Sequence, residues 1–201
     1  NDYIKLTAIC AISIVLDLFI FIDISNPPAW DQGYHLSNLF KMYNIISNDN
    51  INLSIKLDEI LNVTDNYRGP LTYFLSSLKL FFINNSYKVA YISNHLFNII
   101  CIVSIFELGK IIKDSKTGLW ASIFFTFSPL IIKERTNFLI DLSLTSFTIL
   151  YILVLTKWYL SKKEIIIYSF LSGINLALIF LTKPTGIVVF IIPTIILFLQ
   201  K

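Results

Sequence analysis

The stretch Asn26–Leu36, NPPAWDQGYHL, follows directly on an apolar run, Tyr3–Ile24, that is long enough to cross a bilayer. Its two prolines are predicted to stop the helix, because proline lacks the backbone N–H and disfavours helix in the residue before it. Trp30 and Tyr34 are typical of a membrane–water boundary, where one end of a side chain is apolar and the other is hydrated. Asp31 is therefore predicted to be a carboxylate held at that boundary.

The composition indicates a polytopic membrane protein. Of the 201 residues, 55% are hydrophobic, and the mean hydropathy is +0.70. Several apolar runs approach the roughly 20 residues that a membrane helix needs. The net charge of +3 is scattered and forms no patch for nucleic acid. Cys10 and Cys101 both lie inside apolar runs, without the spacing of a metal or redox motif.

The apolar runs predict an all-α fold, a multi-pass transmembrane helical bundle of about six spans. The chain is expected to form a single transmembrane module and to be the N-terminal part of a longer protein, because it lacks an initiating Met and stops just after an apolar run. The predicted spans are residues 4–24, 87–108, 119–132, 138–156, 165–181 and 186–199, with a long first outer loop over 25–86.

The first outer loop is predicted to carry juxtamembrane helices. Tyr34–Ile46 has apolar residues at helical spacing with polar residues between them, a pattern typical of a helix lying flat on a membrane. Ile51–Leu61 alternates apolar and polar residues and fits a short strand or a helix. Leu71–Ile83 is mostly apolar but short for a span, so it is predicted to lie in or on the outer leaflet.

Charge predicts the orientation of the spans. The loops 109–117 and 157–164 are rich in lysine and are the best cytoplasmic candidates under the positive-inside rule. Two spans separate them, so both can lie on the same side. The first loop and the short loops at 133–137 and 182–185 then fall on the extracytoplasmic side of the cell membrane.

Several charged residues gather on that predicted outer side: Asp31, Arg68, the Lys133–Arg135 group, Asp141 and Lys183. Cations at headgroup level can hold a phosphate, and a carboxylate can take the proton of an incoming nucleophile. A lipid-linked phosphosugar suits this arrangement. Taken singly, each residue also fits a solvated loop charge or a helix cap; Asp141, for instance, lies in the first turn of its helix.

Polar residues inside or beside the spans have two interpretations each. Asp17 could form a wall of the site or make a structural hydrogen bond to a neighbouring helix. His35 would share a helix face with Asp31, four residues earlier, and could touch the substrate. His35 and His95 are far apart, and no metal-ligand spacing is present; a divalent metal is left open as a cofactor.

Four segments together resemble a known family. They are WDQGYHL (Trp30–Leu36), NYRGPLTYFL (Asn66–Leu75), FSPLIIKERTNFLIDLSLTSF (Phe127–Phe147) and LTKPTGIVVFIIP (Leu181–Pro193). Their order and spacing resemble those of the polytopic glycosyltransferases that use polyprenyl-phosphate sugars, among them the protein O-mannosyltransferases and the aminoarabinose transferases that modify lipid A. The resemblance covers essentially the whole chain, as the transmembrane module of such an enzyme.

The resemblance implies an inverting transfer from a polyprenyl-phosphate sugar to a lipid, glycan or protein acceptor. It implies that Asp31 is the general base, that Arg68 contacts the donor phosphate, and that Arg135 and Asp141 line the same cavity. Gln32 stands where the family carries a glutamate. Lys183, His35 and Gln32 complete the predicted substrate contacts. The competing hypotheses are a lipid-binding membrane protein without catalysis and a transporter, although no internal repeat supports the latter.

Overall fold

The computed structural model describes residues 1–23, 30–65, 67–82, 90–161 and 165–188, together with 191, 193 and 195. Every regular element in these residues is helical. The two prolines predicted to stop the first helix and most of the predicted span 186–199 lie outside the described residues. The helices are α1 (Asp2–Asp23), α2 (Asp31–Ser47), α3 (Leu53–Leu61), α4 (Leu71–Ser77), α6 (Ile92–Ile112), α7 (Ser115–Thr126), α8 (Pro129–Thr136), α9 (Asp141–Leu160) and α10 (Ile165–Thr182), with 3-10 turns η1 (Leu78–Phe81) and η2 (Pro184–Gly186).

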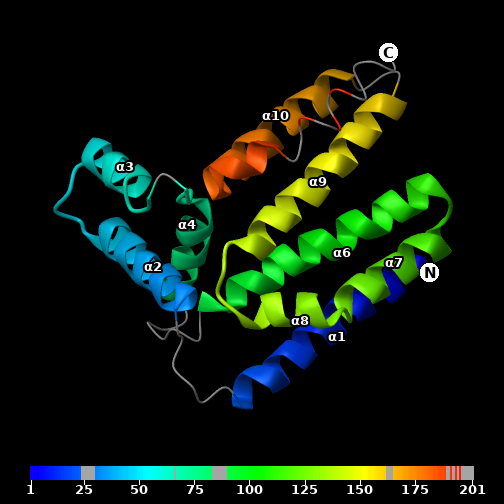
Figure 1. The fold of residues 1–201 in the computed structure, drawn as a ribbon, viewed down its shortest axis with the longest axis horizontal. Coiled ribbons are helices and arrows are strands. Elements are labelled where there is room, and N and C mark those ends of the chain that lie inside the picture. Colours follow the sequence, from blue (N-terminus) through cyan, green and yellow to red (C-terminus); the bar gives the residue numbers. More distant parts are fainter. Residues whose placement is uncertain are drawn as a thin grey trace.

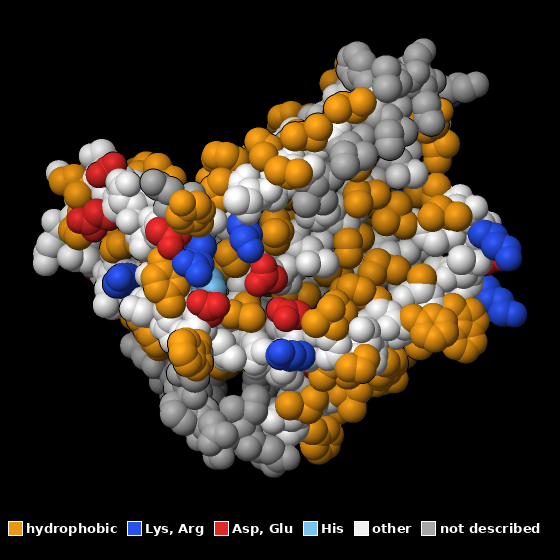
Figure 2. Space-filling view, in the orientation of Figure 1, with side chains coloured by type: hydrophobic (Ala, Val, Ile, Leu, Met, Phe, Trp, Pro, Cys, Tyr) orange, Lys and Arg blue, Asp and Glu red, His pale blue; other side chains and the backbone are white. Residues whose placement is uncertain are grey.

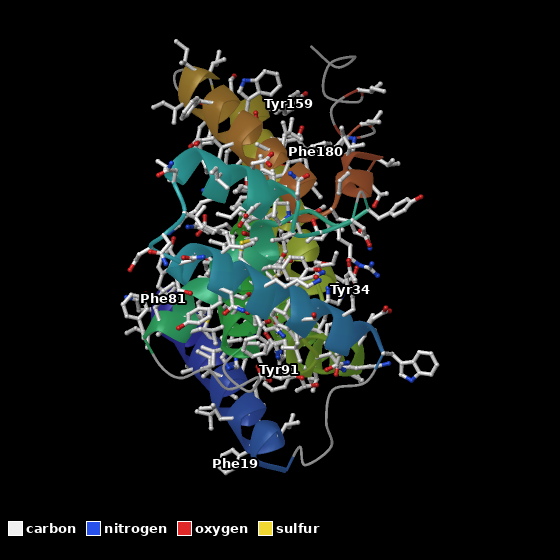
Figure 3. The ribbon with its side chains drawn as sticks, turned by 90° about the vertical axis from the view of Figure 1, so that its left-hand side faces the viewer. Phe19, Tyr34, Phe81, Tyr91, Tyr159 and Phe180 are labelled. Carbon is white, nitrogen blue, oxygen red and sulfur yellow. The ribbon has the colours of Figure 1, made fainter. Side chains whose placement is uncertain are left out.

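Four of these helices are long and apolar enough to cross a membrane: α1, α6, α9 and α10. They correspond to the predicted spans 4–24, 87–108, 138–156 and 165–181. Large apolar side chains stand on their outer surfaces, as Phe19 of α1 and Phe180 of α10 show (Figure 3). The all-α, multi-pass membrane bundle is therefore confirmed.

The segment predicted as one span at 119–132 is divided into two helices. α7 ends at Thr126, and α8 begins at Pro129 after the short break Phe127-Ser128. Proline fits the first turn of α8, where its missing N–H leaves no bond unmade, but inside a helix it would break the hydrogen-bond ladder. α7 has 12 residues and is therefore only about 18 Å long.

α6 and α7 approach each other more closely than ordinary side chains allow. A Cβ added to Gly109 would lie 2.6 Å from the Cα of Gly118, and one added to Gly118 would lie 2.3 Å from the carbonyl oxygen of Phe106. Small residues at such a crossing let two membrane helices pack backbone to backbone. The pair forms a rigid base against which α1 and α9 pack.

One end of the bundle joins the chain's N-terminus to the C-terminal ends of α6 and α9 (Figure 1). The hydroxyl of Tyr3 donates to Glu107 at 3.2 Å and accepts from Lys110 at 2.8 Å, while Lys157 lies 3.7 Å from Glu107. The lysine-rich loop 109–117 and the end of α9 at Leu160 thus lie at the same end, as the predicted alternation of spans requires.

The opposite end carries α2, α3 and α4 (Figure 1). α2 packs on α4 through a core that includes Leu39, Met42 and Tyr73. The segment that fitted either a strand or a helix is helical, as α3. The apolar segment from Leu71 is α4 followed by η1, which ends at Phe81 and is too short to be a candidate span.

Candidate functional site

The predicted site residues Asp31, Asp141, Arg68 and Lys183 all lie at helix ends. Asp31 and Asp141 are the first residues of α2 and α9, where a carboxylate complements the helix dipole. Arg68 precedes α4, and Lys183 directly follows α10. Because these helix ends meet at one end of the bundle, acidic and basic side chains gather there on an otherwise largely apolar surface (Figure 2).

Arg68 is held by three side chains. Its guanidinium lies 2.8 Å from a carboxylate oxygen of Asp65 and 3.7 Å from Asp31, and its Cζ stands 4.6 Å from the centre of the Tyr34 ring. The Tyr34 hydroxyl in turn donates to Asp65 at 3.2 Å. Exposed ion pairs contribute little stability one by one. Their value here is geometric, since they fix Arg68 beside Asp31.

A second ion pair joins Lys183 to Asp141 at 3.2 Å. The two pairs are connected through the backbone, because the N–H of Gly69 donates to the carbonyl oxygen of Thr182 at 3.0 Å. A Cβ at position 69 would lie 1.8 Å from the carbonyl oxygen of Leu181, so only glycine permits this approach. The turn that carries Arg68 is thus seated on the end of α10, next to Lys183.

His35 lies buried beneath these charges. Burial and then Arg68 lower its pKa to about 4, and Lys183 acts in the same direction, while Asp31 and Asp141 oppose them. All four charges therefore lie close enough to act on one imidazole. The Nδ1 atom of His35 is 2.5 Å from the hydroxyl of Tyr73. At neutral pH the ring is uncharged, so its Nδ1 can accept a hydrogen bond from the tyrosine hydroxyl.

Gln32 takes part in hydrogen bonds at the start of α2. Its amide nitrogen donates to the side-chain oxygen of Asn137 at 2.9 Å, and its amide oxygen accepts from the hydroxyl of Tyr91 at 3.0 Å. Figure 3 looks onto this end of the molecule and shows Tyr34 and Tyr91 on it. Gln32 is thereby tied to the turn between α8 and α9 and to the residue before α6.

Arg135 was predicted to line a cavity with Asp141, and its side chain lies buried against Asp17 of α1. It is fully buried, with Nε and Nη2 at 3.0 and 2.9 Å from Oδ1 of Asp17, and its Nη1 donates to the carbonyl oxygen of Thr126 at 2.7 Å. His95 Nδ1 lies 3.3 Å from the other oxygen of Asp17. Of the two interpretations of Asp17, the structure supports the bond to a neighbouring helix.

Sequence reasoning did not single out Asp65 or Asn137, and it treated Tyr34 only as a boundary aromatic. Asp65 lies three residues before Arg68 in a turn, a spacing that allowed their pairing to be foreseen. Burial acts to raise the pKa of Asp65, but hydrogen bonds from the Tyr67 N–H, Tyr34 and Arg68 outweigh it and hold that pKa below its ordinary value. In the described part of the chain, no three His, Cys, Asp or Glu side chains are placed to hold a metal ion.

An apolar pocket of about 160 Å³ lies beside the Gly69 contact. It is formed where α3, α4 and the end of α10 meet, within a few residues of Arg68 and Lys183 in sequence. Its lining contains only apolar residues: Ile60, Leu61, Pro70, Leu71, Phe74 and Leu181.

Comparison with known families matches residues 67–201 to the family described as dolichyl-phosphate-mannose-protein mannosyltransferase. No curated protein and no solved structure gave a match. The matched segment contains Arg68, Asp141 and Lys183, whereas Asp31 and Gln32 precede it, so any role for the latter two rests on their position alone. Because the match spans well over half of the sequence and the fold is a multi-pass bundle, the chain belongs to the dolichyl-phosphate-mannose-protein mannosyltransferase family of membrane glycosyltransferases.

Proposed function

We propose that the protein transfers a sugar from a polyprenyl-phosphate donor to an acceptor at the extracytoplasmic face of the cell membrane, with inversion at the sugar. The observation that carries the proposal is the convergence of Asp31, Arg68, Asp141 and Lys183 around buried His35. Two cations and two carboxylates on the water-facing end of a membrane bundle suit a substrate whose phosphate lies at headgroup level and whose acceptor needs a base.

The proposed reaction needs one base and a stabilised leaving group. Asp31 removes the proton from an acceptor hydroxyl as its oxygen attacks the anomeric carbon. The bond from that carbon to the phosphate oxygen breaks, and polyprenyl phosphate leaves with the electron pair. Arg68 and Lys183 stabilise the negative charge that grows on the phosphate. Attack from the face opposite the leaving group inverts the configuration.

The apolar pocket beside Gly69 supports a lipid-linked donor over a soluble sugar nucleotide. A polyprenyl chain has no polar group beyond its phosphate, and the pocket between α3, α4 and α10 offers none. A phosphate at Arg68 and Lys183 would bring the first isoprene units near this pocket. A sugar nucleotide would instead place a polar ribose and base there.

Asp31→Asn in the full-length protein tests the proposal. Membranes containing the protein and its native acceptors receive polyprenyl phosphate carrying radiolabelled mannose, and label in acid-stable product is counted. Loss of a general base typically costs at least about 100-fold, so transfer by the variant should fall by that factor. Asp49→Asn makes the same change in the outer loop, away from the cluster, and should transfer normally.

Three results would contradict the proposal or parts of it. Normal transfer by well-expressed Asp31→Asn would remove Asp31 as the base. Tight binding of polyprenyl phosphate by the wild type without turnover would favour a lipid-binding protein. Solute flux in proteoliposomes without any transfer would favour a transporter.

A further inference from the structure

A run of hydrogen bonds connects the buried Asp17–Arg135 pair to Gln32, the residue after the proposed base. Its first member after the ion pair is Asn94 of α6. The side-chain nitrogen of Asn94 donates to the backbone oxygens of Arg135 at 2.9 Å and of Asn137 at 2.8 Å. A primary amide has two N–H groups, and both find acceptors on this one turn. Asn94 therefore fixes the backbone at the end of α8.

Asn137 connects this fixed backbone to the first turn of α2. Its backbone is fixed by Asn94, and its side-chain oxygen accepts from Gln32 at 2.9 Å. Tyr91, which directly precedes α6, holds the other half of the Gln32 amide at 3.0 Å. The first turn of α2, which contains Asp31, is thereby attached to α6 and to the α8–α9 turn.

The identity of residue 32 fits these contacts. A glutamine offers one donor and one acceptor, and both are used here, toward Asn137 and Tyr91 respectively. An ionised glutamate accepts only, so it could not donate to Asn137 as Gln32 does. The glutamine at position 32 is thus matched by its surroundings.

The buried ion pair gives the run a fixed starting point. Arg135 and Asp17 are both fully enclosed, and removing one would leave the other as an uncompensated buried charge. The end of α8 can therefore hardly shift relative to α1. Asp31, by contrast, is exposed, with Arg68 at 3.7 Å as its ion-pair partner, so its own contacts fix it only loosely.

We propose that Arg135, Asn137 and Gln32 are positioning residues, which hold the first turn of α2 so that Asp31 faces the acceptor, and that they do not contact the substrate. This inference rests on the proposed function in taking Asp31 as the base. It assigns Arg135 and Gln32 a different role from the direct substrate contact that the sequence suggested. It also gives a role to Asn137, to which the sequence analysis assigned none.

Steady-state kinetics separates positioning from binding. Asn137→Ala and Gln32→Ala should lower kcat about tenfold and leave the KM for polyprenyl-phosphate mannose unchanged, because they misplace the base and spare the cations. Arg68→Gln should instead weaken binding of polyprenyl phosphate. Arg135→Lys, which keeps the charge beside Asp17 but loses the fork geometry, should behave like Asn137→Ala.

A double-mutant cycle tests whether the residues act as one run. The combined variant Gln32→Ala/Asn137→Ala should lose no more kcat than Gln32→Ala alone, since Gln32→Ala already breaks the hydrogen bond to Asn137. Asn137→Ala combined with Lys183→Gln is the control pair, because Lys183 pairs with Asp141 and not with Asp31. The fold-losses in kcat of the two single variants should multiply in this pair, because the two residues act on different parts of the reaction.

Two kinetic outcomes overturn the inference. A raised KM with normal kcat in Gln32→Ala or Asn137→Ala would mean that these side chains touch the substrate. Multiplying losses in the Gln32/Asn137 cycle would mean that they are not coupled.

Failure of the proposed function is recognisable separately, as wild-type protein that binds polyprenyl phosphate but transfers no sugar. The coupling between Gln32 and Asn137 is then measured by thermal unfolding of the wild type, the two single variants and the double variant. Non-additive shifts in Tm uphold the connection between Gln32 and Asn137, and additive shifts overturn it. Binding of polyprenyl phosphate by Asn137→Ala should equal that of the wild type, and weaker binding would overturn the positioning role.

Discussion

His35 shows how burial sets the chemistry of a single side chain in the charged cluster. Burial and the nearby Arg68 guanidinium lower its pKa to about 4, so the imidazole is neutral at physiological pH. It can accept the hydrogen of the Tyr73 hydroxyl, and it adds no positive charge to the cluster. Affinity for a phosphate must then come from Arg68 and Lys183.

The lowered pKa of His35 predicts a loss of stability in acid. The ordinary pKa of histidine is 6.5, so between pH 6.5 and 4 the His35 side chain binds a proton in the unfolded chain but not in the folded protein. Stability should fall through this window, by at most roughly 1.4 kcal/mol per pH unit, and the loss is complete below pH 4. Tm of the purified protein in detergent, measured from pH 7 to 4.5, should decline more steeply for the wild type than for His35→Gln. Parallel curves would contradict this prediction.

At this scale the sequence predicted which charges share one side of the membrane, but not their partners. Loop positions predict a common side of the membrane for four residues, because the alternation of spans fixes the side of each loop. These residues are Asp31, Arg68, Asp141 and Lys183. Loop positions do not predict the partner of Arg135, because this partner is Asp17, which lies 118 positions away on α1. One signal was present: a carboxylate inside a span needs a partner, and an arginine near another helix end can supply it.

Among the elements, the contact between the 67–70 turn and α10 decides where Arg68 lies. The backbone of Gly69 touches that of Leu181 and Thr182 without any side chain between them. This contact aligns two segments more than 100 residues apart and places Arg68 next to Lys183.

Gly69→Ala is therefore expected to displace the turn. The added Cβ would fall 1.8 Å from a backbone oxygen that cannot yield, and overpacking of this kind typically costs about 1–3 kcal/mol. Tm should drop by about 2–12 °C, and sugar transfer should fall with it. The measurements are thermal unfolding in detergent and the transfer assay on the same preparation.

Gly173→Ala is the matched control on α10. A Cβ there meets nothing within 4 Å, and alanine favours a helix over glycine by roughly 1 kcal/mol. Its Tm should stay constant or rise, with normal transfer. Equal losses in both variants would mean that the Gly69 contact is not special.

Helix positions were largely predictable because apolar runs of span length have few alternatives in a membrane. The exceptions have local causes. Pro129 divides the segment 119–132, which hydropathy alone treats as continuous. Ile51–Leu61 alternates polar and apolar residues over too few positions to separate strand from helix, and its neighbours decide for α3.

At the scale of the whole molecule, the bundle has two chemically different ends. Lys110, Lys113 and Lys116 lie at the end that holds the N-terminus, and the charged cluster lies at the other. The positive-inside rule assigns the lysine-rich end to the cytoplasm. The candidate site would then face outward.

Labelling of single cysteines tests this orientation. In a variant with Cys10 and Cys101 replaced by alanine, Lys133→Cys should react with a membrane-impermeant maleimide in intact cells, because it is exposed at the cluster end. Lys113→Cys is equally exposed at the lysine-rich end and should react only after permeabilisation. The reverse pattern would place the site in the cytoplasm, and equal labelling of both would contradict the predicted alternation of spans.

The pairing of Arg68 and Lys183 with carboxylates has a consequence for the order of substrate binding. Arg68 and Lys183 are already occupied by Asp31, Asp65 and Asp141. An arriving phosphate therefore competes with these carboxylates for the N–H groups of Arg68 and Lys183. At Arg68 the weakest partner is Asp31, at 3.7 Å, so it is the one to be displaced. Loading of the donor would itself release the base for the acceptor, and the acceptor would be activated only once the sugar is in place.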